Sequence, residues 1–300
     1  VKVYSQLAKK VWPDLPVIVG GVEASLRRFA HYDYWDDKVL PSVLVESGAD
    51  LLIYGMGERA VESIADQLQA GVPLDQIHYV PGTCFISTNL EDVEDYIELA
   101  PYEVVSKNKK AFSTAFKLQY WEQDPIHGKT IVQPHEGRFL VQLPPALPLE
   151  QSEMDTLYSL PFTRMPHRSY GNANIPALEE VLFSITSHRG CFGSCAFCAI
   201  TSHQGRMIQN RSQDSIVAEA KLITQHRDFK GYIHDVGGPS ANFRQVACEG
   251  QKTSGACRGR QCIGVDPCDQ LEVDHTEYME LLRKVRALPK VKKVFIRSGI

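Results

Sequence analysis

Hydrophobic runs and apolar stripes alternate along the first hundred residues. Short apolar runs, two of them ended by glycine, predict buried strands at residues 16–21, 51–55 and 77–80. Residues 58–70 instead carry an apolar stripe at helical spacing, and Gly71 is placed to end that helix. A second helix is predicted near residues 89–100, with Asn89 as its cap. Strands that alternate with helices predict an α/β layer with a parallel sheet.

The rhythm breaks in the next part of the chain. Seven prolines lie between positions 125 and 166, and proline disfavours the interior of regular elements. We therefore expect a Pro-rich connector over residues 106–176. Within it, alternating residues predict one hairpin, with strands at 130–133 and 138–142, and a short helix near residues 153–158.

Strand and helix signals return in the last third of the chain. Strands are predicted at 181–185, 232–236 and 294–296. Helices are predicted after Ser212, which can cap the first one, and over residues 277–288. This order fits the first strands of a (β/α) partial barrel, in which functional sites lie on loops that follow the strands. We expect an α/β domain over 1–105, the connector over 106–176, and the start of a barrel over 177–300 with a Cys-rich insertion at 240–274.

Composition and charge exclude some classes of protein. The formal net charge of −4 at pH 7 gives no general attraction to nucleic acid or to anionic lipid. No stretch of 18 apolar residues occurs, so no membrane-spanning helix is expected. The chain begins at Val1 and stops directly after a strand-like run, which we interpret as a segment of a longer protein with both terminal regions missing.

The cysteines are unevenly placed. Of the 8 cysteines, Cys84 stands alone in residues 1–190, and the other seven lie between positions 191 and 268. An odd local cluster in an ordinary chain does not fit a disulfide scaffold. It favours metal ligation in a reducing compartment, and hence a cytoplasmic location.

The first cysteine group has the spacing C-x3-C-x2-C, formed by Cys191, Cys195 and Cys198. Three thiolates on one loop can bind a soft metal centre, and a [4Fe–4S] cluster held by three of them keeps one iron open to an outside ligand. Gly190 and Gly193 let the backbone bend closely around such a cluster. The alternative is a structural zinc or redox loop, although three cysteines without a fourth local ligand make a poor closed zinc site.

The sequence of this loop resembles the signature of radical S-adenosylmethionine (SAM) enzymes, including the aromatic Phe197 before the last cysteine. The resemblance implies that Cys191, Cys195 and Cys198 ligate a [4Fe–4S] cluster and that the open iron binds SAM. It also implies that Phe197 lies near the adenine. The reduced cluster would cleave SAM to a 5′-deoxyadenosyl radical that abstracts hydrogen from a substrate.

A Gly-Gly pair follows the second predicted barrel strand. Radical SAM proteins often carry Gly-Gly-Glu here, where backbone carbonyls meet the amino group of SAM. Gly237 and Gly238 match that pattern, but Pro239 replaces the glutamate. The resemblance therefore implies backbone contacts to SAM from these two glycines and no contact from an acidic side chain, while a plain turn after a strand is the alternative.

The second cysteine group contains Cys248, Cys257, Cys262 and Cys268. Four thiolates can bind zinc or hold another iron–sulfur cluster, but the spacing is typical of neither, so free thiols remain an alternative. This group and the run 235–242, together with the runs 20–28, 31–35 and 205–212, resemble the YgiQ family of radical SAM proteins. The substrate of that family does not follow from the resemblance.

The first domain resembles the Rossmann-like, cobalamin-binding-like domain that precedes the barrel in many radical SAM proteins. No Asp-x-His-x-x-Gly motif for cobalamin ligation occurs, so we do not expect cobalamin binding from this segment. Residues 209–211 are expected to contact either SAM or the linker. His188 and Arg189 either tune the cluster or are solvated.

The sequence thus predicts an enzyme of the radical SAM superfamily that acts on an unknown substrate. It would need an electron donor such as flavodoxin or ferredoxin, and neither a membrane nor a nucleic acid partner is expected. Two alternatives stay open. One is a non-catalytic, metal-stabilised binding or redox-sensing module, and the other is an RNA-modifying radical SAM enzyme.

Overall fold

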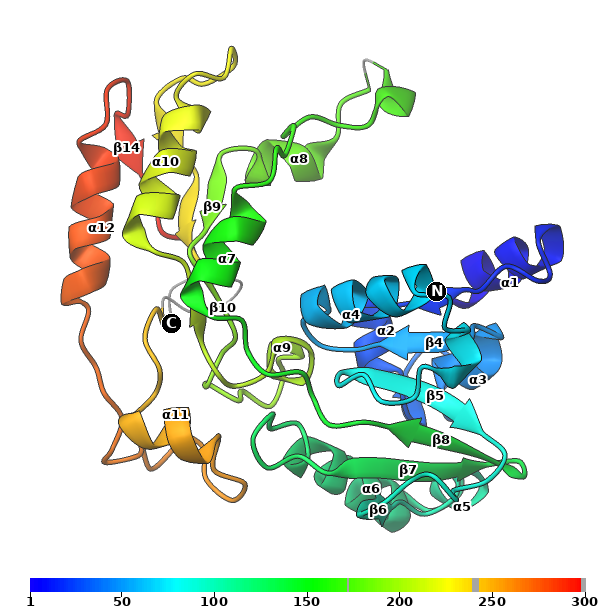
Figure 1. Ribbon diagram of the computed structural model, residues 1–300. Helices are drawn as coiled ribbons and strands as arrows, with labels where there is room; N and C mark the ends of the chain where they lie inside the picture. Colours follow the sequence, from blue (N-terminus) through cyan, green and yellow to red (C-terminus); the bar gives the residue numbers. More distant parts are fainter. Residues whose placement is uncertain (172, 239–242, 298–300) are drawn as a thin grey trace. The chain divides into compact units, whose positions relative to one another are not determined.

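The structure is a computed structural model that describes residues 1–171, 173–238 and 243–297 (Figure 1). It is a mixed α/β structure in which the chain divides into two units. Unit 1 comprises Val1–Leu147, Thr201–Gly205 and Thr253–Arg258, and unit 2 comprises Pro148–Ile200, Arg206–Lys252 and Gly259–Ile300. Part of the second cysteine-rich stretch, Thr253–Arg258, therefore belongs to unit 1, and so does the segment Thr201–Gly205 that follows the first cysteine group.

Unit 1 contains a six-stranded sheet and the helices that pack on it. Its sheet strands are β1 (Ile18–Val19), β4 (Leu51–Ile53), β5 (Thr83–Ser87), β6 (Tyr96–Glu98), β7 (Thr130–His135) and β8 (Arg138–Gln142). Its helices are α1 (Lys2–Val11), α2 (Gly21–Leu26), α3 (Val43–Ser47), α4 (Glu58–Gln69), the 3₁₀ turn η1 (Leu74–Gln76), α5 (Tyr102–Val105) and α6 (Lys109–Trp121). A separate hairpin pairs β2 (His31–Asp33) with β3 (Lys38–Leu40).

The six strands have the order β1-β4-β5-β8-β7-β6. β1 and β4 are parallel, and so are β6 and β7. The pairs β4–β5, β5–β8 and β7–β8 are antiparallel. The expected parallel sheet is thus a mixed one. β5 runs antiparallel to both of its neighbours, and the predicted hairpin of β7 and β8 adds a further antiparallel pair within the sheet.

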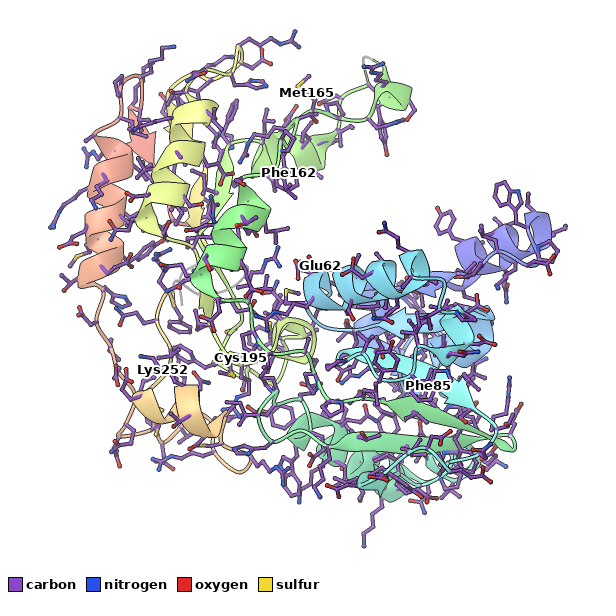
Figure 2. All side chains as sticks on the ribbon, viewed as in Figure 1. Glu62, Phe85, Phe162, Met165, Cys195 and Lys252 are labelled. Carbon is purple, nitrogen blue, oxygen red and sulfur yellow. The ribbon has the colours of Figure 1, made fainter. Side chains whose placement is uncertain are left out.

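Alternation along the strands gives this sheet two buried faces. One face presents Leu52, Cys84 and Leu140 to a core that also contains residues of α2, α3, α5 and α6. The other presents Leu51 and Phe85 to a core with α4 and the segment after it (Figure 2). Successive strand residues point to opposite faces, so helices can bury both sides of one sheet.

Several sequence predictions for unit 1 are confirmed and two are wrong. The helix over 58–70 is α4, and Gly71 after it has a φ of +86°. Residues 77–80 form no strand, because Ile77 and Val80 pack irregularly beneath the sheet and the strand begins only at Thr83. The helix expected near residues 89–100 is replaced by strand β6, which pairs with β7 at the sheet edge.

Unit 2 is built around short parallel strands. Its strands are β9 (Ser184–Thr186), β10 (His188–Arg189), β11 (Gln209–Asn210), β12 (Tyr232–Ile233), β13 (Asp235–Gly237) and β14 (Lys293–Val294). Its helices are α7 (Gln151–Tyr158), the 3₁₀ turn η2 (Arg168–Tyr170), α8 (Pro176–Val181), α10 (Gln213–Ile223), α11 (Glu249–Ser254, shared with unit 1) and α12 (Thr276–Arg286). α9 (Ile200–Gln204) belongs to unit 1 from Thr201 onward.

β13 pairs in parallel with β9, and β12 pairs in parallel with β14. Helices α10 and α12 cover these strands and bury Ile216, Leu281 and Val285 against Ile185 and Val236. Ser212 caps α10, since its side chain accepts a hydrogen bond from the N–H of Ser215. The chain order strand–helix–strand–helix–strand predicted for this region is present.

The predicted strand at 181–185 begins later than expected, because residues 176–181 form α8 and the strand itself is Ser184–Thr186.

The Pro-rich connector contains more regular structure than expected. It includes α6, which is capped by Asn108, whose side chain accepts hydrogen bonds from two backbone N–H groups. Its hairpin belongs to unit 1 and its helix α7 to unit 2.

None of the helices in the described part of the chain has the length and the apolar composition that a membrane span requires.

Candidate functional site

The loop with the first three cysteines leaves β10 through Gly190. This glycine has a φ of +86°, and a Cβ atom on it would lie 2.0 Å from the carbonyl oxygen of Met207. β10 ends just before Gly190 and pairs antiparallel with β11. The chain that enters β11 therefore passes close to Gly190. A side chain at position 190 is therefore excluded both by backbone conformation and by space.

Gly193 brings two of the three cysteines together. A Cβ atom at this position would lie 3.4 Å from the sulfur of Cys191 and 3.7 Å from the sulfur of Cys195, so both thiols face the space beside the glycine. The N–H of Gly193 donates to the Cys191 sulfur at 3.4 Å. The N–H of Cys198 donates to the Cys195 carbonyl at 3.0 Å and places the third cysteine one turn further along the loop.

The donor set of this loop fits an iron–sulfur cluster. All three cysteines are free thiols, with Cys191 buried and the other two half-buried. Between them, the buried hydroxyl of Ser194 has no hydrogen-bond partner among the described residues. Within the described ranges, however, no three His, Cys, Asp or Glu side chains are placed to hold a metal ion. The structure thus brings Cys191 and Cys195 together without forming the complete ligand set.

The Gly-Gly pair lies next to the strand that leads into this loop. Gly237 ends β13, and its carbonyl accepts the N–H of Ser187 at 2.8 Å. A Cβ atom on Gly238 would lie 2.2 Å from Nε2 of His188, which is buried. His188 therefore packs against the Gly-Gly turn and is not solvated. Pro239 and the rest of the expected run to residue 242 lie outside the described residues.

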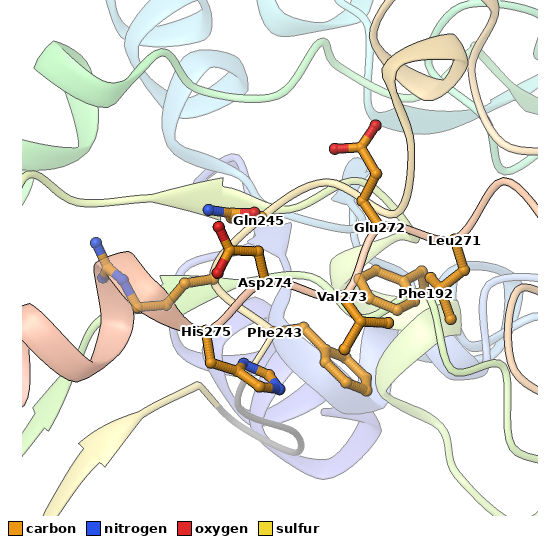
Figure 3. Close-up of a pocket in the computed structure, with 9 residues that line it drawn as sticks. Phe192, Phe243, Gln245, Leu271, Glu272, Val273, Asp274 and His275 are labelled. Atoms are coloured by element: carbon orange, nitrogen blue, oxygen red, sulfur yellow. The ribbon is translucent and has the colours of Figure 1, made fainter.

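Two aromatic side chains form one wall of a small cavity in unit 2. Phe192, from the cysteine loop, stacks on Phe243 with ring centroids 4.3 Å apart. Figure 3 shows these rings with Gln245, Asp274 and other residues that line the cavity, whose volume is about 60 Å³. Phe197, in contrast, is 89% exposed. The loop thus contributes Phe192, which the sequence motif did not single out, to the wall of this cavity.

The residues after β11 hold a buried cation. Arg211 is fully buried, donates to the carbonyl of Thr186 at 2.9 Å and forms an ion pair with Glu219. Its guanidinium lies 4.3 Å from the ring centre of Tyr158, and Arg164 shares Glu219 with it. Burial lowers the pKa of Arg211 to about 10. These contacts join β9, α7 and α10, which supports a structural role for Arg211.

A second buried arginine connects the loop after β13 to α12. Arg244 is 3% exposed and pairs with both carboxylate oxygens of Glu277, each at 2.9 Å. It also donates to the carbonyl of Ser187 at 3.1 Å and to that of Arg211 at 3.0 Å. Burial acts to raise the pKa of Glu277, but the hydrogen bonds from Arg244 and Gln213 hold that pKa below its usual value.

The second cysteine group is divided between the two units. Cys257 is exposed and belongs to unit 1, whereas Cys248, Cys262 and Cys268 belong to unit 2. The N–H of Cys268 donates to the carbonyl of Cys262 at 3.1 Å, and Arg206 lies 3.8 Å from the Cys262 sulfur. No metal-binding group is formed by these four cysteines in the part of the chain that the structure describes.

Sequence reasoning did not single out Arg244, Glu277 or Phe243. The two partners of the ion pair are 33 residues apart in the sequence, and no local pattern connects them. The aromatic stack likewise joins two loops that are distant in the sequence. The only available signal was that charged residues inside an otherwise apolar layer need a partner.

Comparison with known proteins finds a matching family and similar proteins of two Clostridium species. Residues 1–184 match the Radical SAM N-terminal family. A UPF0313 protein from Clostridium botulinum (strain ATCC 19397 / Type A) is 56% identical over 301 residues, which cover 100% of this chain and 47% of that protein. A UPF0313 protein from Clostridium perfringens (strain SM101 / Type A) is 51% identical over 300 residues, which cover 99% of this chain and 45% of that protein. The chain spans about half the length of these relatives.

Two solved structures are of a radical S-adenosylmethionine methyltransferase, TsrM, from Kitasatospora setae. One contains its tryptophan substrate and a SAM analogue, and the other contains cobalamin and a [4Fe-4S] cluster. Both are 15% identical to this chain and cover 98% of it and 39% of their own length, with TM-scores of 0.42 and 0.41. Since the family match covers more than half of the residues, the chain belongs to the Radical SAM N-terminal family.

Proposed function

We propose that this chain carries the centre at which a radical SAM enzyme cleaves SAM, with Cys191, Cys195 and Cys198 as ligands of a [4Fe–4S] cluster. The observation that carries the proposal is the cysteine loop itself. It presents three cysteine thiols directly after β10, and two of the sulfurs face the same space beside Gly193. Membership of the Radical SAM N-terminal family supports it.

The residues of the loop would act as ligands and spacers. Three cysteine thiolates leave one iron free for the amino and carboxylate groups of SAM. When bound and reduced, such a cluster supplies the electron that breaks a carbon–sulfur bond of SAM and yields methionine and a 5′-deoxyadenosyl radical. The N–H of Gly193 would donate to the Cys191 thiolate, and such hydrogen bonds tune cluster potentials.

Other groups near the loop would bind the organic ligands. Backbone groups of Gly237 and Gly238 would contact SAM, and Phe197, which is exposed, would cover the adenine. The cavity behind Phe192 and Phe243 would take a small apolar group of the substrate, since a volume of about 60 Å³ accommodates only a few heavy atoms. A one-electron donor such as flavodoxin or ferredoxin would reduce the cluster, and a cytoplasmic location stays a prediction.

Anaerobic reconstitution of the full-length protein with iron and sulfide tests this proposal. We expect Cys191→Ala to lose roughly four irons per chain relative to the wild type, together with the EPR signal of the reduced cluster. Formation of 5′-deoxyadenosine from SAM should stop as well. Cys84→Ala is the matched control, because Cys84 is a buried thiol of unit 1 that should leave both readouts unchanged.

The same experiment separates the alternatives. Equal iron content in the wild type and in Cys191→Ala would contradict the proposal. Zinc in place of iron, with no cleavage of SAM, would favour a metal-stabilised binding or redox-sensing module. Replacing Cys248, Cys257, Cys262 and Cys268 together, with metal analysis and EPR, tests whether the second group binds a metal.

A further inference from the structure

Unit 1 contains a buried arginine that no carboxylate neutralises. Arg28 is 3% exposed and lies between the sheet and α2, and none of the ion pairs among the described residues includes it. Burial lowers its pKa, but a guanidinium stays protonated at neutral pH. A buried charge of this kind is expensive unless an opposite charge lies next to it.

The neighbours of Arg28 are neutral. Its guanidinium lies 4.8 Å from the ring centre of Tyr54, and Cys84 is close enough to interact electrostatically. Burial raises the pKa of Cys84 to about 12 and raises that of Tyr54 well above its usual value. Both groups therefore keep their protons at pH 7, and neither supplies the missing negative charge.

The hydrogen bonds of Arg28 leave one edge incomplete. Nε donates to Oε1 of Gln142 at 2.5 Å, and Nη1 donates to the carbonyl of Ser25. Nη2 of Arg28 and Nε2 of Gln142 are both buried and have no partner in the described part of the chain. Gln142 itself is fully buried. Two donors without an acceptor are costly at such a site.

The geometry of the two side chains places these donors together. In the planar guanidinium, Nε–H and one N–H of Nη2 point along the same edge, which is the edge that grips carboxylates. Gln142 occupies the Nε half of that edge through its oxygen, and its amide nitrogen is bonded to the same carbon as that oxygen. An acceptor beside this amide can receive hydrogen bonds from both free donors.

The position within the sheet also fits a ligand. β1 and β4 are parallel, and β5 is antiparallel to both β4 and β8, so β1, β4 and β8 run in the same direction. Tyr54 directly follows β4 and Gln142 ends β8, which places them at the carboxyl ends of these strands. Ligands of α/β sheets bind at that edge.

We propose that Arg28 and Gln142 form a binding site for a small anion, of the size of chloride or of a single carboxylate group. The anion accepts hydrogen bonds from Nη2 of Arg28 and Nε2 of Gln142, and it neutralises the guanidinium. The site lies within unit 1 and is separate from the three cysteines of unit 2. A test of this anion site can therefore fail or succeed independently of the test of the proposed cluster.

Thermal unfolding of the full-length protein tests the site. Sodium chloride and sodium formate are each compared with sodium gluconate, whose anion is too large for the site, at equal ionic strength. We expect the unfolding midpoint to be about 2–4 °C higher with the small anion. Comparing chloride with formate shows whether the site prefers a halide ion or a carboxylate group. Arg138→Met removes an exposed arginine of β8 and is the control that keeps this dependence.

Gln142→Glu supplies the anion within the chain. Its carboxylate can bind both Nε and Nη2 of Arg28, so the midpoint in gluconate should rise to the wild-type value in chloride and the anion dependence should disappear. Arg28→Met removes the cation and should also abolish the anion dependence, and Gln142→Glu keeps the test valid if Arg28→Met does not fold. A crystal soaked in bromide should give an anomalous peak between Arg28 and Gln142. Equal wild-type midpoints in all three salts, with no bromide peak, would overturn the proposal.

Discussion

Single residues at the candidate site are determined by close packing as much as by chemistry. The sequence marks Gly190 and Gly193 as positions where the chain bends around a cluster. The structure gives each a distinct reason, because Gly190 lies against the backbone at Met207 and Gly193 leaves room for two sulfurs. The spacing of the cysteines could be interpreted from the sequence, but these contacts could not.

Gly190→Ala tests the packing at the start of the loop. Its φ of +86° disfavours any side chain, and the Cβ atom would overlap with the Met207 carbonyl. Gly171→Ala is the matched control in the same unit, because its φ is +53° but, apart from its chain neighbours, no described residue has an atom within 4 Å of its Cβ position. We expect the control to lose about 1–3 kcal/mol of stability from backbone strain.

The change at position 190 should cost clearly more than the change at 171, because β10 and β11 must separate to admit the methyl group. Urea unfolding of both variants measures the difference. Equal losses would mean that the strands do not approach as closely as the structure has them.

At the scale of elements, long periodic segments were predicted well and short ones were not. The stripes of α4, α10 and α12 and the hairpin of β7 and β8 each contain enough residues to reveal their period. β6 has only three residues, and its apolar positions suit a helix equally well until β7 pairs with it. Ile77 and Val80 are apolar because they pack beneath the sheet, which a strand would also require.

The contact between α12 and the loop after β13 predicts a dependence on pH. The pKa of Glu277 is lower in the folded chain than its usual value near 4.5. Ionised Glu277 therefore stabilises the fold at pH values above about 4.5, and this contribution is lost as the pH falls through the lowered pKa. Glu277→Gln should cost about 1–3 kcal/mol at pH 7, since Arg244 stays buried without a charged partner.

The unfolding midpoint measured between pH 3 and pH 7 checks this prediction. The gap between the wild type and Glu277→Gln should be constant above pH 5 and should shrink below pH 4.5. Glu280→Gln, an exposed change on the same helix, should leave the profile unaltered. A gap that stays constant down to pH 3 would show that Glu277 does not titrate with the fold.

For the whole molecule, the division of the chain differs most from what a linear sequence indicates. Residues 253–258 of the second cysteine group belong to unit 1. Asp124 accepts the N–H of Ala256 at 2.6 Å, and Glu122 binds Arg258 at 3.0 Å. A Cβ atom on Gly255 would lie 2.3 Å from the Asp124 carboxylate. Contacts across about 130 residues of sequence hold this segment.

Asp124→Asn tests how the segment is held. The amide keeps one oxygen for the turn at Ile126 and His127 but presents N–H groups to the N–H of Ala256, so that hydrogen bond is lost. Trypsin should then cleave after Arg258 about 5 to 150 times faster, as expected for a loss of about 1–3 kcal/mol. Mass spectrometry of timed digests measures the rate. Asp75→Asn, an exposed change in unit 1, is the control, and equal rates in both variants would contradict the prediction.

The sequence by itself determined which cysteines stand together on one loop. The C-x3-C-x2-C spacing and its place after a strand are local properties, and their resemblance to the radical SAM signature is the basis on which a cluster loop is predicted. Only the tertiary structure decided which buried charges are compensated, because contacts between distant segments pair Arg244 with Glu277 but give Arg28 no carboxylate partner among the described residues. Ion pairing in the interior depends on distance in space, and spacing along the chain carries no record of it.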